Sequence, residues 1–289
     1  MPLQVEHLSF TYSKKTPYEK QALRDVSFTL RDGECVGLVG STGSGKSTLV
    51  QHLNGLIKLT EGKIVVDDVD LSARKPDLNK LRKNVGMLFQ YPEYQLFADT
   101  VLDDVMFGPL NFGMTKEEAQ ESAEKAIRAV GLNYEEIKDR SPIDLSGGQK
   151  RRVAVAGVLS YRPSILILDE PTAGLDPLGK RDMLNLVASL RQNGMVKTVV
   201  MVSHNMDEIA EYADRVLVLQ KGTLACDETP RDFFYTRDVT SYGLALPHAV
   251  HATKLLEQNG IVLPSRPLTR DDFVAALKAY PFRKEDRDA

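Results

Sequence analysis

The chain has 289 residues, of which 42% are hydrophobic, and its formal net charge is −3. This length allows one large domain with a small appendage, and the charge argues against a protein that holds nucleic acid or anionic lipid through a strong positive field. No run of about 18 apolar residues is present, so we expect no membrane span, and the first residues lack the apolar run of a secretory signal. The two cysteines, Cys35 and Cys226, have no zinc-type spacing and are expected to be reduced thiols.

The N-terminal residues predict an antiparallel hairpin. Residues 3–10 and 22–30 alternate apolar and polar side chains, as half-exposed strands do, and a polar loop separates them. Tyr12 follows the first strand and could offer its ring to an adenine, worth about 1–3 kcal/mol by analogy with base stacking. The alternative is an ordinary tyrosine on an edge strand.

The next segment reads G-x-x-x-x-G-K-[ST], which is the pattern of a phosphate-binding loop. Its residues are Gly40, Ser41, Thr42, Gly43, Ser44, Gly45, Lys46, Ser47 and Thr48. The apolar residues 34–39 before it predict a buried parallel strand, and residues 47–56 predict a helix. A strand, a glycine turn and a helix start direct backbone N–H groups at one anion. Lys46 would reach the β- and γ-phosphates, and Ser47 would bind Mg²⁺.

Two further features follow the loop. Asp67, Asp68 and Asp70 cluster near the short strand predicted at 63–67, and we interpret them as a solvated hairpin rather than a metal site. Residues 85–89 predict a buried strand that ends at Gln90. Ligands bind at the carboxyl ends of such strands, so we expect Gln90 to reach Mg²⁺ and an attacking water.

Residues 86–131 predict a largely helical insertion. Thr115 and Glu118 form a capping box for a helix that runs to about Val130. The insertion is rich in large apolar side chains, which either form its own small core or in part face a partner. They are Tyr94, Leu96, Phe97, Met106, Phe107 and Phe112.

A second anion-binding helix start is predicted after Leu145. It comprises Ser146 as N-cap, then Gly147, Gly148 and Gln149. One nucleotide does not need two such sites from one chain, so this one is expected to serve the nucleotide of a neighbouring chain. The basic residues 150–152 oppose the helix dipole, so they have another use or form a solvated face.

The remaining candidates for chemistry lie at strand ends. The strand at 164–168 leads into Asp169 and Glu170, whose side chains would point to opposite faces of an extended chain. Asp169 would hold Mg²⁺, and Glu170 would polarise a water for attack on the γ-phosphate. The strand at 198–202 leads into His204, which is placed to sense the γ-phosphate.

A helix is predicted at 178–192, and the last core strand at 215–219. After Thr229 the composition changes, and helices at 248–258 and 271–280 predict a small helical appendage.

These motifs together resemble the nucleotide-binding subunit of an ATP-binding cassette (ABC) transporter over about residues 3–229. In family terms, Tyr12 is the A-loop, residues 40–48 the Walker A, Gln90 the Q-loop and residues 145–149 the signature. Residues 165–170 are the Walker B, residues 173–176 the D-loop and His204 the switch histidine. The D-loop has Ala-Gly where Ser-Ala is common. The resemblance implies an α/β P-loop NTPase domain (1–229) with a mixed core sheet, an antiparallel β subdomain and a helical subdomain at about 86–160. A small helical domain (230–289) follows.

The resemblance also implies a head-to-tail dimer in which each ATP lies between the Walker A of one subunit and the signature of the other. ATP would contact Tyr12, residues 40–48, Ser146, Gly147, Gly148, Gln149 and Asp176. Mg²⁺ would bind Ser47, Gln90 and Asp169. Glu170, His204, Gln90 and Lys46 would carry the catalysis.

A narrower resemblance is to the ATPases of energy-coupling factor (ECF) transporters, most of all the second of their two paralogous ATPase subunits. The residues that carry it are 16–23, 51–56, 90–97, 100–105 and 107–109. It implies uptake of vitamins or transition-metal ions, driven from the cytoplasmic face of the membrane. The partners implied are a paralogous ATPase (with a homodimer as the alternative), a transmembrane coupling protein that docks at the Q-loop surface, and a membrane-embedded substrate-binding component. No nucleic acid is expected as a partner.

Two other functions compete with this one. A soluble ABC-type ATPase acting on nucleic acid or ribosomes would need coiled-coil arms, a second cassette or a basic groove, and the sequence shows none. A non-hydrolysing ATP clamp would have no need for both Glu170 and His204.

Overall fold

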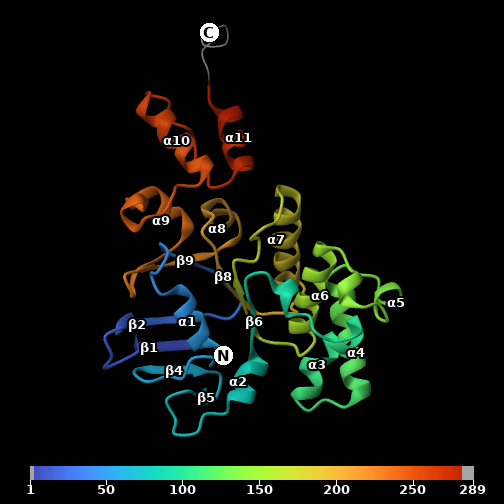
Figure 1. The fold of residues 1–289 in the computed structure, drawn as a ribbon. Helices are drawn as coiled ribbons and strands as arrows, with labels where there is room; N and C mark the ends of the chain where they lie inside the picture. The colour runs from blue at the N-terminus through green and yellow to red at the C-terminus, as the bar shows by residue number, and fades with distance from the viewer. Residues whose placement is uncertain (1–2, 282–289) are drawn as a thin grey trace.

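The computed structural model describes residues 3–281, and the charged segment 283–289 lies outside that range. The chain is built around a six-stranded sheet in the order β10-β9-β3-β8-β7-β6 (Figure 1). All neighbouring pairs are parallel except β9 and β10. The strands are β3 (Cys35–Val39), β6 (Val85–Leu88), β7 (Ile165–Asp169), β8 (Thr198–Val202), β9 (Arg215–Gln220) and β10 (Thr223–Glu228).

Both faces of this sheet are buried, which explains its continuous apolar strands. Along β7, Leu166 and Leu168 pack in one cluster with helices, whereas Ile165 and Ile167 pack in another cluster with the antiparallel sheet. The expected strands at 85–89, 164–168, 198–202 and 215–219 are confirmed within one or two residues.

A four-stranded antiparallel sheet in the order β2-β1-β4-β5 forms the second layer. Its strands are β1 (Leu3–Tyr12), β2 (Lys20–Leu30), β4 (Lys63–Val66) and β5 (Val69–Asp70). The helix α1 (Lys46–Leu53) lies between the two sheets, where Leu49, Val50 and Leu53 are buried. The predicted hairpin is confirmed, and Asp67 and Asp68 lie at the tight β4-β5 turn. Within the described residues no group of three or more His, Cys, Asp or Glu is arranged to hold a metal ion.

A helical lobe lies beside the sheet edge at β6 (Figure 1). Its helices are α3 (Val101–Asn111), α4 (Lys116–Ala129), α5 (Tyr134–Ile137) and α6 (Gly147–Leu159), with the short 3-10 helices η1 (Pro92–Gln95) and η2 (Pro142–Asp144) and, nearer the antiparallel sheet, α2 (Leu78–Asn84). The capping box of Thr115 and Glu118 is confirmed. The insertion begins later than residue 86, because β6 is hydrogen-bonded into the central sheet.

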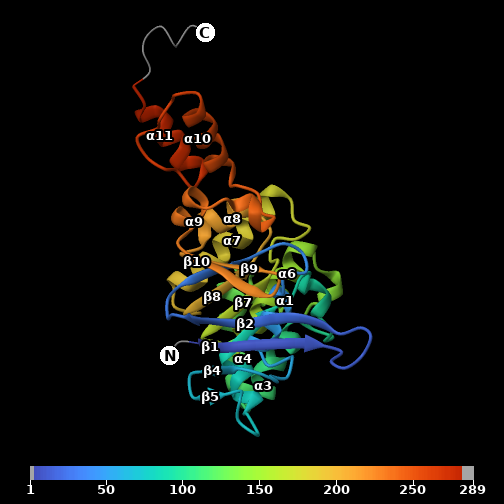
Figure 2. The same ribbon diagram turned by 90° about the vertical axis from the view of Figure 1, so that its left-hand side faces the viewer.

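Two helices connect strands of the central sheet: α7 (Pro177–Gln192) joins β7 to β8, and α8 (Met206–Tyr212) joins β8 to β9. After β10 the chain continues with α9 (Pro230–Thr236), η3 (Val239–Tyr242), α10 (His248–Gln258) and α11 (Arg270–Ala279). Phe233 and Phe234 are fully buried against β9, β10 and α8. Beyond them α10 and α11 project away from the rest of the molecule (Figure 2). Among the residues 3–281, no helix is both long and apolar enough to cross a bilayer.

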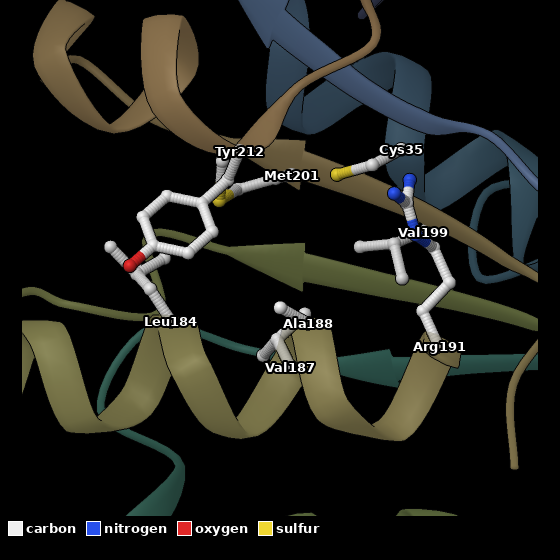
Figure 3. A pocket seen from close by; sticks show the side chains of 8 residues that line it. All are labelled: Cys35, Leu184, Val187, Ala188, Arg191, Val199, Met201 and Tyr212. Carbon is white, nitrogen blue, oxygen red and sulfur yellow. The ribbon is translucent and has the colours of Figure 1, made fainter. Parts of the chain in front are cut away.

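Cys35 lines a small cavity between α7, α8 and the sheet (Figure 3). The cavity measures about 30 Å³, room for about one water molecule. Burial raises the pKa of the Cys35 thiol to about 12, so the group stays protonated. The thiolate is the reactive form of cysteine, and Cys35 is therefore an inert part of the core rather than a nucleophile.

Candidate nucleotide-binding and hydrolysis site

The predicted site residues converge at one edge of the central sheet. The register of the sheet brings the last residues of four strands together. Val202 of β8 pairs with Leu38 of β3 on one side and with Asp169 of β7 on the other. Leu168 of β7 pairs in turn with Leu88 of β6. The carboxyl ends of these four parallel strands therefore lie side by side. Gly40, Gln90, Glu170 and His204 follow those ends within two residues, so this edge gathers four motifs that are far apart in sequence.

The phosphate-binding loop depends on two of its glycines. Gly40 has a φ of +150°, and a Cβ there would lie 2.2 Å from the carbonyl oxygen of Leu219. Gly45 has a φ of +110°, and its Cβ would lie 2.7 Å from the carbonyl oxygen of Ala22. Only glycine fits such positions. The loop thereby wraps tightly before α1 begins at Lys46, one residue earlier than expected.

Lys46 is held over the loop. Its ammonium group donates to the carbonyl oxygens of Gly40 at 2.7 Å and Ser41 at 3.2 Å. The buried hydroxyl of Ser44, in the same loop, has no hydrogen-bond partner. A cation and an unpaired hydroxyl at a helix start fit an incoming phosphate.

Tyr12 lies beside the loop and shares a pocket of about 170 Å³ with it. The Tyr12 ring packs edge-on against Phe10 at 4.8 Å, and its hydroxyl lies 3.1 Å from the hydroxyl of Thr48. The ring is 39% exposed, which leaves a face available for a base. Lys20 and Ala22 also line this pocket. The sequence analysis gave neither a binding role, because they lie on the second strand of the hairpin and entered only through the resemblance carried by residues 16–23.

Replacing Tyr12 with alanine is expected to weaken ATP binding by about 5- to 150-fold, since base stacking contributes about 1–3 kcal/mol. Tyr12→Phe keeps the ring and should bind ATP within about threefold of the wild type. Calorimetric titration with ATP and with inorganic tripolyphosphate separates the contribution of the adenine to the affinity from that of the phosphates, because tripolyphosphate has no base. Equal losses for both ligands in Tyr12→Ala would mean that the ring supports the loop rather than the adenine.

One geometric expectation is wrong. Asp169 and Glu170 do not continue an extended strand, because Glu170 has a φ of +53°, in the left-handed region. A non-glycine residue there costs about 1–3 kcal/mol, and such strain clusters at functional sites. The Glu170 N–H donates to the carbonyl of Val202 at 3.0 Å, and its own carbonyl accepts from Ala173. The separation of the two carboxylates therefore comes from a turn.

The turn brings Glu170 against His204. The Nδ1 of His204 lies 2.7 Å from the Oε2 of Glu170. The Glu170 side chain is only 15% exposed, whereas that of His204 is 79% exposed. The partly buried carboxylate is thus partnered by an imidazole that solvent or a ligand can reach.

Burial shapes the charges at this edge. It raises the pKa of Glu170, with His204 and Lys46 opposing the shift and Asp169 adding to it. It also raises the pKa of Asp169 against the charge of Lys46, and lowers the pKa of Lys46 against both carboxylates. A carboxylate whose pKa is raised is a better proton acceptor at neutral pH. Glu170 therefore has the electrostatics of a general base.

The residues expected to hold Mg²⁺ fit a hard cation that prefers oxygen ligands. Ser47 lies in the first turn of α1, Asp169 ends β7, and Gln90 follows β6 at the neighbouring strand end. Their hydroxyl, carboxylate and amide oxygens come from three elements at the same sheet edge.

The signature residues lie on a different element, at the start of α6 in the helical lobe (Figure 1). The hydroxyl of Ser146 accepts from the N–H of Gln149, and the Gln149 side chain accepts from the N–H of Ser146. Gly147 and Gly148 are exposed, and a Cβ added to either would meet no other atom within 4 Å. Asp176 caps α7 by accepting from Gly179 at 2.7 Å. This surface is open to a ligand carried by another molecule.

The basic run after the signature has a use that the sequence left open. Arg151 is 3% exposed and binds both carboxylate oxygens of Glu93 in η1, at 2.9 and 3.0 Å. It also donates to the carbonyl of Ala173 at 3.1 Å. Arg151 therefore joins the signature helix, the segment after Gln90 and the segment after Glu170. The solvated-face interpretation is wrong for this residue.

The large apolar side chains of the helical lobe divide into two groups. Met106 is buried, and Leu96 and Phe112 are partly buried. Tyr94, Phe97 and Phe107 are 83%, 65% and 51% exposed, and the last two rings stack edge-on at 4.8 Å. We call these three residues the aromatic surface. Of the six, Met106 belongs to the lobe core and Leu96 packs against it, whereas Phe112 packs edge-on against Tyr161 at 5.0 Å.

Comparison with known proteins agrees with this geometry. The model of the ABC transporter family matches residues 23–173. The solved structure of cbiO1 from Clostridium perfringens, part of the ABC transporter complex cbiONQ, is 35% identical with a TM-score of 0.72, and the match covers 87% of this chain and 98% of that one. A dimeric ATP-binding cassette bound to ADP and phosphate after hydrolysis is 30% identical with a TM-score of 0.68, over 80% of this chain and all of that one. The protein is an ABC-type ATPase that binds ATP.

Curated relatives narrow the class. The energy-coupling factor transporter ATP-binding protein EcfA2 of Symbiobacterium thermophilum is 50% identical over 96% of each chain. The EcfA2 protein of Caldanaerobacter subterraneus is 46% identical over 97% of this chain and 98% of its own. The chain belongs to the family of ECF transporter ATP-binding proteins, and it is most like the EcfA2 members. These relatives do not favour a soluble ATPase acting on nucleic acid or ribosomes.

Proposed function

We propose that this chain hydrolyses ATP to drive an ECF-type importer for vitamins or transition-metal ions, bound peripherally to the cytoplasmic face of the cell membrane. The observation that supports the chemistry best is the contact between Glu170 and His204 at the sheet edge that also carries Lys46. The relatives named above support the transport role.

In the proposed mechanism, the loop from Gly40 to Thr48 binds the ATP phosphates, and Tyr12 stacks on the adenine. Glu170 accepts a proton from the attacking water, and His204 stays within hydrogen-bond reach of both Glu170 and the γ-phosphate. Lys46 stabilises charge on the phosphate oxygens. Ser47, Asp169 and Gln90 would hold Mg²⁺, which neutralises developing charge on the β- and γ-phosphates when bound.

The nucleotide site is completed by a second ATPase subunit. Ser146, Gly147, Gly148 and Gln149 form an exposed helix start in the helical lobe, on a different element from the phosphate-binding loop. A head-to-tail partner would place its own signature residues against the phosphate-binding loop of this chain. Asp176 would then lie near the interface. We propose a paralogous ATPase as the partner, and a second copy of this chain as the alternative.

The aromatic surface of Tyr94, Phe97 and Phe107 is the proposed contact for a transmembrane coupling protein. These rings are exposed next to η1, which follows Gln90 along the chain. Exposed apolar patches mark protein interfaces. A membrane-embedded substrate-binding component would complete the transporter, and residues 230–289 are proposed as a separate domain that helps the ATPase subunits associate.

A pull-down of the tagged chain from detergent-solubilised membranes of its host tests the transport role. We expect a second cassette ATPase and a polytopic membrane protein among the partners identified by mass. The triple variant Tyr94→Ser, Phe97→Ser, Phe107→Ser is the matched control, and it should lose the membrane protein but keep the second ATPase. Recovery of ribosomes, nucleic acid or soluble proteins alone would refute the transport role and leave the ATPase chemistry untouched.

A further inference from the structure

A buried carboxylate lies behind the pair of Glu170 and His204. Glu208, in the first turn of α8, is 5% exposed and matches no motif that the sequence analysis used. A buried charge is costly unless hydrogen bonds compensate it. Its surroundings therefore indicate what holds it in place.

Three side chains donate to the Glu208 carboxylate. The hydroxyl of Thr172 donates to Oε1 at 2.8 Å, and the amide of Asn205 donates to the same oxygen at 3.1 Å. The hydroxyl of Ser203 donates to Oε2 at 2.9 Å. Thr172 and Ser203 are themselves 4% and 1% exposed. The carboxylate is thus satisfied by donors from two separate segments.

Those two segments are the ones that carry the proposed catalytic pair. Thr172 lies two residues after Glu170, and Ser203 and Asn205 flank His204 on either side. The imidazole of His204 is 79% exposed, and its Nδ1 contacts Glu170. Packing does not fix so exposed a ring, so the backbone of residues 203–205 must set its position.

We propose that Glu208 is a positioning residue that holds the Glu170 turn and the His204 loop at a fixed separation. The carboxylate binds both segments at once, through residues that lie one position from His204 and two from Glu170. Its hydrogen bonds reach neither the phosphate-binding loop nor Tyr12. Its loss should therefore affect turnover and leave nucleotide binding in place.

The test compares variants of the full-length chain by steady-state ATP hydrolysis and by ATP titration. Glu208→Ala is expected to lower kcat about 10- to 100-fold, since a displacement of about 1 Å in an active site can cost about 100-fold. KM and the Kd for ATP should stay within about threefold of the wild type. Glu208→Gln should recover most of the rate, because its amide can accept from Thr172 and Asn205 and donate to Ser203.

Asp207→Ala is the matched control. Asp207 is also a carboxylate in the first turn of α8, but it contacts His248 at the start of α10. The Asp207→Ala variant should keep its kcat within about twofold of the wild type. Equal losses in Asp207→Ala and Glu208→Ala would overturn the proposal, because they would reflect the charge of the helix start. A parallel loss of ATP affinity and kcat would overturn it too.

Thr172→Val keeps the proposal testable if Glu208→Ala does not fold. This change removes one hydrogen bond to Glu208 and should lower kcat about threefold or more, with the Kd for ATP unchanged. An unchanged kcat in a folded Thr172→Val chain would refute the proposal.

The inference rests on the proposed role of Glu170, so Glu170→Gln is assayed beside it. If Glu170→Gln loses turnover but Glu208→Ala keeps the wild-type kcat, only the positioning role fails.

Discussion

Replacing Glu170 with glutamine is expected to lower ATP turnover by about 100- to 10 000-fold, the range for loss of a general base. That loss corresponds to about 2.7–5.4 kcal/mol of the activation barrier. The amide keeps the volume of the side chain and can still accept from His204, but it cannot take a proton from water. Burial raises the pKa of the native carboxyl, which strengthens the base that the variant lacks. Single-turnover hydrolysis measures the effect.

Nucleotide binding should persist in Glu170→Gln, because Tyr12 and the loop at residues 40–48 are unchanged. Calorimetric titration with ATP checks this directly. Glu211→Gln is a matched control, since Glu211 is an exposed glutamate on α8, and it should hydrolyse ATP at the wild-type rate. Near-normal hydrolysis by Glu170→Gln would remove Glu170 from the catalytic role and direct attention to another base at the sheet edge.

Replacing Glu93 with alanine is expected to lower the free energy of unfolding by about 3 kcal/mol. The change leaves Arg151, which is 3% exposed, without the carboxylate that binds it through two hydrogen bonds. Removing one partner of a buried ion pair costs about 3–5 kcal/mol because the remaining charge is uncompensated. The Glu93 side chain is itself 20% exposed, so we expect the lower end of that range. Urea unfolding followed by circular dichroism measures the loss.

Two variants control this experiment. Gln95→Ala changes an exposed residue of the same η1 turn and should stay within about 0.5 kcal/mol of the wild type. Glu93→Gln keeps an oxygen acceptor for the guanidinium and should lie between the wild type and Glu93→Ala. A Glu93→Ala chain as stable as Gln95→Ala would show that the ion pair with Arg151 contributes nothing to the fold.

Local patterns were sufficient for the strands and the phosphate-binding loop. The central strands are apolar throughout because both faces of the sheet are covered. Such a continuous apolar run can be recognised in the sequence without knowing which segments cover it. The spacing of Gly40, Gly45 and Lys46 predicts the loop because part of the constraint is local: the backbone has a φ of +150° at Gly40 and +110° at Gly45, which glycine adopts without strain. The capping box of Thr115 and Glu118 is equally local, and the structure has it as predicted.

Helices in the second half of the chain were predicted from local patterns too, with differences of a residue at their ends. The expected helix at 271–280 is α11 (Arg270–Ala279), and the expected helix at 178–192 is α7 (Pro177–Gln192). Proline fits the first turn of a helix, so Pro177 belongs to α7. Such differences leave the assignment of each element unchanged.

The sequence by itself therefore determined most strands of the central sheet, several helices, the loop and the strand ends that carry the chemistry. The helices α2, α8 and α9 were not expected from the sequence. Tertiary structure alone decided how they meet. The left-handed turn at Glu170, the burial of Arg151 and the hydrogen bond from Thr172 to Glu208 depend on contacts between segments far apart in the chain. No local pattern encodes them, because a charged side chain reads as solvated until its distant partners are known. Long-range hydrogen bonds to buried charges are satisfied only in the assembled fold.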